Sequence, residues 1–165
     1  MTFTIRNLDV VSDLSKVEAF YAAAPDYWEA AEGSPPGFEK AKEFFEDIPP
    51  NSDPKQVHRL GLFSREQLSG IADLFFGFPE RGDAYIGLMM LGPWARNQGT
   101  GKSFLSHVEG LARTGGAKNL YLAVMTINPK GRAFWEREGF TATGLSGVSV
   151  VGNSQQELHR LVKPL

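Results

Sequence analysis

The sequence contains no cysteine, no long apolar run and no strong excess of either charge. Without cysteine there is no disulfide framework, no thiolate zinc site, no iron–sulfur cluster and no cysteine nucleophile. No apolar segment approaches the roughly 20 residues that a membrane helix needs. The N-terminus lacks the basic and apolar segments of a signal peptide. We therefore expect a cytoplasmic protein with no membrane partner.

Charge is nearly balanced over the whole chain, with 17 Lys and Arg against 19 Asp and Glu and a net charge of -2. This balance gives no reason to expect nucleic acid as a partner. Residues 1–54, however, carry 11 acids and 4 bases, whereas residues 55–165 carry 8 acids and 13 bases. The first portion is therefore net −7 and the second net +5, which suits two partners of opposite charge.

Length and composition predict one domain. A chain of 165 residues with 42% hydrophobic and 22% charged content suits a single globular domain over residues 1–165. The three histidines, His58, His107 and His159, show no metal-ligand or catalytic-triad spacing. We therefore expect no metal.

Apolar periodicity predicts alternating helices and strands. The expected strands are residues 3–6, 57–63, 68–76, 85–91, 120–127, 140–151 and 157–162. The expected helices are residues 12–23, residues 37–45, a segment ending at Gly115-Gly116, and residues 129–138. A helix between strands 85–91 and 120–127 predicts that these two strands are parallel, and therefore an α/β fold.

The most informative segment joins strand 85–91 to the helix that follows. It contains Gly99 and Gly101, two residues apart, flanked by Arg96 and Lys102. Glycines here let backbone N–H groups approach an anion, and the helix N-terminus adds a favourable dipole. We interpret this segment as a phosphate-binding loop. A glycine-rich connection that only turns the chain is the alternative.

One known phosphate-binding loop fits this segment in part. Gly101-Lys102-Ser103 matches the end of the P-loop pattern G-x-x-x-x-G-K-[ST]. Arg96 replaces the first glycine of that pattern, and strand 120–127 is followed by Asn128 where an aspartate is needed to support Mg²⁺. A P-loop nucleotide-binding protein is therefore the distant alternative.

A second pattern fits better. Arg96-Asn97-Gln98-Gly99-Thr100-Gly101 matches R/Q-x-x-G-x-G/A, and residues 128–140 look like N-x-x-A-x-x-[LF]-[YW]-x-x-x-G-F. On both motifs, the chain resembles the GNAT N-acetyltransferase superfamily from about Tyr85 to Phe140. The resemblance implies an α/β (α+β) fold with a mixed, mostly antiparallel twisted sheet. It implies about seven strands, a central splayed parallel pair and about four flanking helices.

The resemblance also implies that acetyl-CoA binds between strands 85–91 and 120–127. By analogy, main-chain groups of Met90 and Leu91 contact pantetheine and the acetyl carbonyl, and Asn128 bonds to the pantetheine arm. The pyrophosphate would lie on Arg96, Asn97, Gln98, Gly99, Thr100, Gly101 and Lys102. Trp135 would lie beside the thiol end of the coenzyme or pack in the core.

The implied reaction is direct acetyl transfer to an amine in a ternary complex. Trp135 stands where many family members have a tyrosine that protonates the departing thiolate, so water or another hydroxyl must do so. Asp73 interrupts an apolar strand and is the candidate general base, with an Asp on a solvent face as the alternative. Tyr85 is a second candidate catalytic residue. A non-catalytic acyl-CoA sensor is the alternative function.

Tyr27 and Trp28 lie in the region that forms one wall of the acceptor site in this family. Two rings among acidic residues suit a small-molecule or peptide-like amine. The −7 charge of residues 1–54 favours a cationic one. Packing of the rings against the sheet is the alternative. Dimers are common in the family, which makes a homodimer a further expectation.

Overall fold

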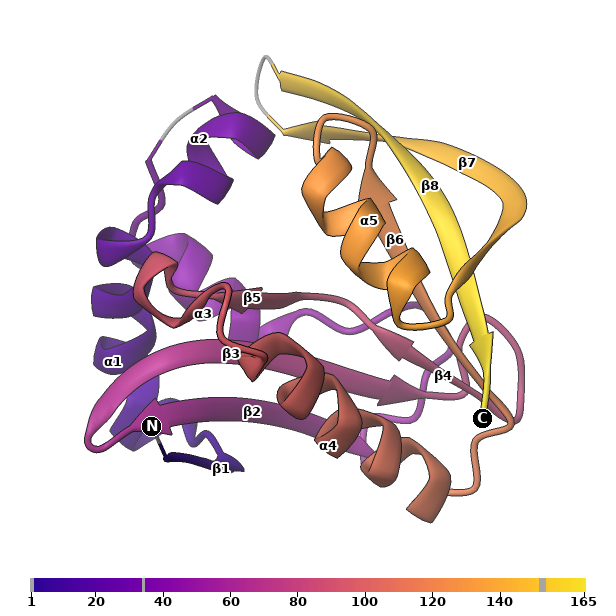
Figure 1. The fold of residues 1–165 in the computed structure, drawn as a ribbon, viewed down its shortest axis with the longest axis horizontal. Coiled ribbons are helices and arrows are strands. Elements are labelled where there is room, and N and C mark those ends of the chain that lie inside the picture. The colour runs from indigo at the N-terminus through magenta and orange to yellow at the C-terminus, as the bar shows by residue number, and fades with distance from the viewer. Residues whose placement is uncertain (1, 34, 152–153) are drawn as a thin grey trace.

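Residues 2–33, 35–151 and 154–165 are described by the computed structural model (Figure 1). The strands are β1 (Phe3–Asn7), β2 (Val57–Ser64), β3 (Gln67–Phe76), β4 (Asp83–Ile86), β5 (Met89–Leu91), β6 (Asn119–Met125), β7 (Thr141–Val151) and β8 (Ser154–Pro164). The α-helices are α1 (Val10–Ala23), α2 (Asp26–Glu32), α3 (Phe38–Glu46), α4 (Thr100–Thr114) and α5 (Pro129–Arg137), and a 3-10 turn, η1 (Pro93–Ala95), precedes α4. These elements confirm the predicted α/β fold.

The strands form one mixed sheet in the order β1-β2-β3-β4-β6-β8-β7, and β5 pairs with β3 off this path. Neighbours are antiparallel except β4 and β6, which run parallel from Asp83↔Asn119 to Ile86↔Leu122. The predicted parallel pair is thereby confirmed, with α4 as its crossover. The described residues form eight strands and five α-helices, close to the seven and four expected.

The expected strand 85–91 is broken in two at Gly87 and Leu88. Oδ1 of Asp73, on the neighbouring β3, accepts hydrogen bonds from the backbone nitrogens of Gly87 at 2.7 Å and Leu88 at 2.8 Å. The backbone nitrogen of Asp73 in turn donates to the Leu88 carbonyl at 3.0 Å. Glycine is required at the break, because a Cβ on Gly87 would lie 2.8 Å from Asp73 Oδ1. As a result, β5 stays paired with β3 and is not paired with β6.

Helices cover both faces of the sheet (Figure 1). α1, α2 and α3 share one buried apolar cluster, which includes Val17, Trp28, Phe44 and Ile71. α4 and α5 contribute to a second cluster, which includes Phe104, Leu105, Val108, Trp135 and Leu74. The apolar run in β3 follows from this arrangement, because both faces of the strand are covered. None of the helices in the described ranges is long and apolar enough to cross a membrane.

Candidate active site

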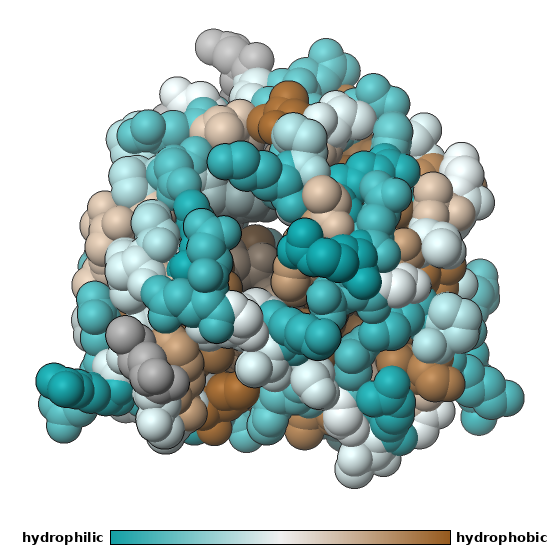
Figure 2. Space-filling view, in the orientation of Figure 1, coloured by the Kyte–Doolittle hydropathy of each residue, from teal (hydrophilic) through white to brown (hydrophobic). Residues whose placement is uncertain are grey.

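A cavity of about 1050 Å³ opens where β5 separates from β6. Figure 2 shows the hollow near the centre of the face seen in Figure 1, with hydrophilic residues around its rim. It is lined from four sides: by α2, by β5, by the loop that leads into α4, and by the end of β6 with α5. Ten of the residues predicted for the site line it, namely Tyr27, Met90, Leu91, Arg96, Asn97, Gly99, Gly101, Lys102, Asn128 and Trp135.

The free edge of β5 faces this cavity. The Gly92 nitrogen donates to the Ser69 carbonyl at 2.8 Å, and the Leu88 carbonyl accepts from Asp73, so both peptide groups face β3. Main-chain groups alternate in direction along a strand. Met89 and Leu91 therefore direct their main-chain groups toward the gap. The sequence predicts this role for Met90 and Leu91, and the alternation favours Met89 in place of Met90.

The loop before α4 has the features of an anion-binding helix N-terminus. Gly99 is the N-cap of α4 at φ 76°, and no side chain caps it. The first intrahelical bond runs from the Ser103 nitrogen to the Gly99 carbonyl, which leaves the preceding N–H groups of the first turn without helical acceptors. Lys102 lines the cavity beside them. Free N–H groups, the helix dipole and a cation together fit a pyrophosphate.

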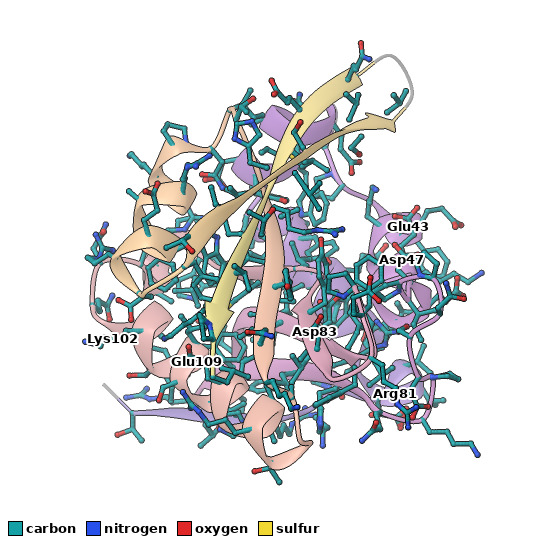
Figure 3. The ribbon with its side chains drawn as sticks, turned by 90° about the vertical axis from the view of Figure 1, so that its right-hand side faces the viewer. Glu43, Asp47, Arg81, Asp83, Lys102 and Glu109 are labelled. Atoms are coloured by element: carbon teal, nitrogen blue, oxygen red, sulfur yellow. The ribbon has the colours of Figure 1, made fainter. Side chains whose placement is uncertain are left out.

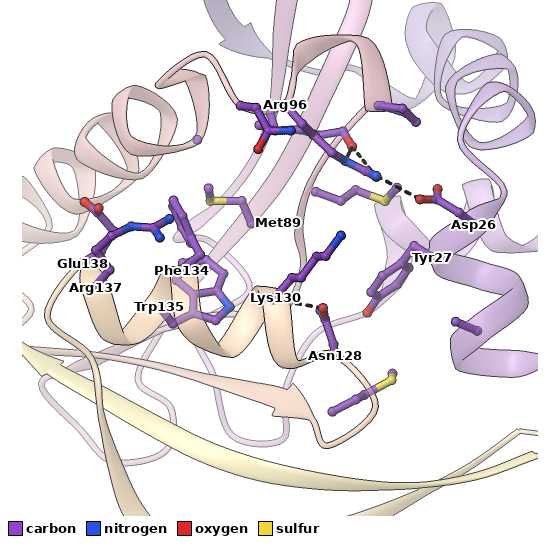
Figure 4. Close-up of a pocket in the computed structure, with 18 of the residues that line it drawn as sticks. Asp26, Tyr27, Met89, Arg96, Asn128, Lys130, Phe134, Trp135, Arg137 and Glu138 are labelled. Carbon is purple, nitrogen blue, oxygen red and sulfur yellow. Dashed lines mark hydrogen bonds and ion pairs between the residues drawn. The ribbon is translucent and has the colours of Figure 1, made fainter.

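Arg96 links this loop to two other parts of the site (Figure 4). Its Nε and Nη2 donate to the Leu91 carbonyl at 3.1 and 2.9 Å. Its Nη1 lies 2.9 Å from Oδ2 of Asp26, on α2. The guanidinium holds the pKa of the Asp26 carboxyl below its usual value. Nothing in the sequence pattern pairs two residues so far apart in the chain.

The N-terminal end of α5 forms the opposite wall. Asn128 is its N-cap, and Oδ1 of that side chain accepts from the Gly131 nitrogen at 3.0 Å. Trp135 both lines the cavity and packs in the core, with its ring 5.0 Å from Phe134 and 5.4 Å from Phe140. Trp135 therefore has the core packing that was one alternative, and its place beside the thiol end of the coenzyme stays a prediction.

Of the two aromatic residues on α2, Tyr27 lines the cavity and Trp28 lies in the core. Tyr27 lines the cavity, and its hydroxyl points across it toward Asn128 and Lys130 (Figure 4). Burial raises the pKa of that hydroxyl. Trp28 is buried, with its ring 4.8 Å from Tyr21 and 5.0 Å from Tyr27. Trp28 therefore supports the ring of Tyr27 from behind.

Four other predicted residues are not among the described residues that line the cavity. Asp73 is buried at the β4–β5 break, where burial raises its pKa to about 7. Tyr85 packs edge-on against Phe78 at 5.0 Å. Thr100 is buried, and Gln98 Nε2 donates to the Trp94 carbonyl at 3.0 Å. Their predicted roles in catalysis and coenzyme binding stay predictions.

Sequence reasoning missed most of the apolar lining. Met89, Met125, Ile127 and Phe134 line the cavity, as do Arg137 and Glu138 at the far end of α5. The position of Met89 could have been predicted, because Met89 lies two residues before Leu91 and both point the same way along a strand. Within the described ranges, no group of three or more His, Asp or Glu side chains is placed to hold a metal ion.

Residues 17–140 match the sequence model of the acetyltransferase (GNAT) family. The chain belongs to this family. Its members use acetyl-CoA as cosubstrate, and the predicted resemblance is confirmed. No curated protein matches the chain.

Several solved structures of GNAT proteins share the fold. An acetyltransferase from Thermus thermophilus is 22% identical with a TM-score of 0.77, over 100% of this chain and 98% of that one. The ribosomal-protein-S18-alanine N-acetyltransferase from Escherichia coli is 17% identical with a TM-score of 0.72, over 99% and 94%. Ard1 from Thermoplasma volcanium is 16% identical with a TM-score of 0.74, over 100% and 99%. The TM-scores show a common fold.

Proposed function

We propose that this GNAT acetyltransferase moves the acetyl group of acetyl-CoA directly to a primary amine in a ternary complex. The acceptor is a small-molecule or peptide-like amine. The observation that carries the proposal is the separation of β5 from β6 beyond Ile86, with a cavity between them. One end of that cavity is the uncapped start of α4, and the other is the aromatic face of α2.

The residues along the cavity suit the successive parts of the coenzyme. The N–H groups at the start of α4, with Arg96 and Lys102, would hold the pyrophosphate. The main-chain groups of Met89 and the N–H of Leu91, whose carbonyl accepts from Arg96, would pair with pantetheine as a neighbouring strand does. Asn128 would approach the pantetheine arm from the opposite wall.

Acetyl-CoA supplies a thioester carbonyl that a deprotonated amine attacks. The N–H of Met89, directed toward the gap, would stabilise negative charge on the carbonyl oxygen. Among the described residues that line the cavity, Tyr27 carries the one hydroxyl. Tyr27 or cavity water would therefore protonate the departing thiolate, since the indole of Trp135 is not an acid. The catalytic roles of Asp73 and Tyr85 stay predictions.

Two measurements test this function. Acetyl-CoA should raise the melting temperature of the protein, by more at higher acetyl-CoA concentration. ATP with Mg²⁺ should not raise it. Free thiol should then be released when amines are added. A melting shift with ATP and none with acetyl-CoA would overturn the proposal in favour of the P-loop alternative. A shift with acetyl-CoA but no thiol release with any amine would favour the non-catalytic sensor.

The single domain over residues 1–165, the cytoplasmic location and the homodimer stay predictions from the sequence.

A further inference from the structure

Apolar side chains make up much of the cavity lining next to α2, where Asp26, Asn128 and Lys130 also line it. α2 presents Tyr27, Ala30 and Ala31 there, and Met125 and Ile127 come from the end of β6 and the segment after it. Apolar side chains on both sides make a slot that suits the hydrocarbon part of a ligand.

This wall is held in place by the β7–β8 hairpin. Oγ of Ser154 donates to the Ala31 carbonyl at 3.1 Å, and Nε2 of Gln156 donates to the Ala30 carbonyl at 3.4 Å. Both contacts tie the C-terminal half of α2 to β8, which Figure 1 shows reaching over toward α2. The Tyr27 ring is packed edge-on against Trp28. The slot is therefore already formed before a ligand binds.

The carboxylates of α2 do not supply this slot with a free negative charge. Asp26 lines the cavity but is paired with Arg96 at 2.9 Å. Glu32 lies 2.7 Å from Lys40 Nζ, and Glu29 is not among the described lining residues. Glu138 lines the cavity at the end of α5, on the far side from Tyr27 in Figure 4.

Two further acids of the N-terminal portion, Glu43 and Asp47, are not among the described residues that line the cavity. Glu43 and Asp47 appear on the opposite side of the molecule from Lys102 in Figure 3. Glu43 is paired with Lys40 at 2.9 Å. Among the acids of residues 1–54 that the structure describes, Asp26 is the one that lines the cavity, and it is paired with Arg96.

Given the proposed function, on which this step rests, we infer that the acceptor is a small monoamine with an apolar body. Its hydrocarbon part would fill the slot between Tyr27, Ala30 and Met125, with the amine directed toward the acetyl carbonyl. A second ammonium group would meet no unpaired carboxylate there, since Asp26 is paired with Arg96, and Lys130 adds a like charge to the lining. The slot thus discriminates against diamines and polyamines, and narrows the cationic acceptor that the sequence favoured to one with a single amine.

Two matched amines test the inference on the wild-type protein. Pentylamine and 1,5-diaminopentane differ by one terminal ammonium, and thiol release from acetyl-CoA gives kcat/KM for each. We expect pentylamine to be preferred by about tenfold or more. Across ethylamine, propylamine and pentylamine, kcat/KM should rise roughly three- to fourfold per added methylene. A preference for the diamine, or a flat series, would overturn the inference.

A single substitution should reverse the preference. Ala30→Asp places a carboxylate in the slot and should raise kcat/KM for 1,5-diaminopentane relative to pentylamine. Ala22→Asp, on an exposed face of α1 outside the cavity lining, is the matched control and should leave the ratio unchanged. An unchanged ratio in Ala30→Asp that melts like the wild type would count against the slot as the acceptor site.

Failure of this inference and failure of the proposed function give different results. If acetyl-CoA stabilises the protein and diamines are the better acceptors, the function stands and the acceptor class is wrong. If acetyl-CoA causes no melting shift, the proposed function fails, and the inference fails with it.

Discussion

Oδ1 of Asp73 lies 2.7 Å from the backbone nitrogen of Gly87 and accepts its hydrogen bond. The same oxygen accepts from the nitrogen of Leu88 at 2.8 Å. One side chain thus takes the place of strand partners at the point where β4 ends and β5 begins. The direction of β5, and with it the edge that β5 turns toward the cavity, depends on this contact.

Substituting Asp73 in two ways separates a structural from a catalytic role. Asp73→Asn keeps a carbonyl oxygen for both N–H groups, whereas Asp73→Ala leaves them without a partner, at a cost of roughly 1–3 kcal/mol each. We expect Asp73→Ala to lose stability in urea unfolding and to lose acetyl transfer. Asp73→Asn should keep kcat within several-fold.

A large loss of kcat in Asp73→Asn would instead support a catalytic role for the carboxylate. A general base needs the carboxylate itself. If Asp73→Asn folds like the wild type but loses kcat by more than about 100-fold, the catalytic role first predicted for Asp73 is supported and the positioning role is not.

The stability of the protein should depend on pH through Asp73. Burial raises its pKa from 3.8 to about 7, so the folded protein binds this proton more tightly than the unfolded chain does. The contribution of Asp73 to the free energy of unfolding is therefore largest below about pH 4 and falls as pH rises toward about 7. Above about pH 7, the contribution of Asp73 to the free energy of unfolding is constant. Urea unfolding of wild type and Asp73→Asn from pH 4 to pH 8 measures it, and a constant difference between the two proteins would refute the assignment.

Coenzyme binding should depend on Gly101. A Cβ there would lie 3.2 Å from Cε1 of Phe134, and the carboxylate of Gly101→Glu would stand beside the phosphate-binding N–H groups. We expect the dissociation constant for acetyl-CoA to rise at least about tenfold by calorimetry. Gly110→Glu, on the same helix with open space around its Cα, is the control. Equal affinities in the two variants would rule out the loop as the pyrophosphate site.

Removing the charge of Asp26 should strengthen coenzyme binding. Asp26→Asn frees Arg96 from its ion pair and leaves more positive charge near the phosphates. We expect acetyl-CoA to bind a few-fold more tightly at low ionic strength, with the gain fading at high salt. Stability should change by less than about 1 kcal/mol, because both side chains are more than a third exposed. Glu29→Gln is the control on α2, and weaker binding by Asp26→Asn would contradict this prediction.

Features that depend on short stretches of chain could be predicted from the sequence. Strand β5, the glycine loop and α4 are contiguous over residues 89–114, and so are the residues from Asn128 to Phe140. Local turns, caps and apolar periodicity decide such segments. Two of them at a set separation were enough to predict the family and ten residues that line the cavity.

Only the tertiary structure decided the contacts between distant segments. The break after Ile86 depends on a carboxylate from β3, and Arg96 meets Asp26 across 70 residues of chain. The sequence gives the net charge of residues 1–54 but not the ion pairs: α2 turns Tyr27, Ala30 and Ala31 toward the cavity, and its Asp26 and Glu32 are paired with Arg96 and Lys40. Composition cannot show this, because the direction of a side chain is set by the elements packed against its helix.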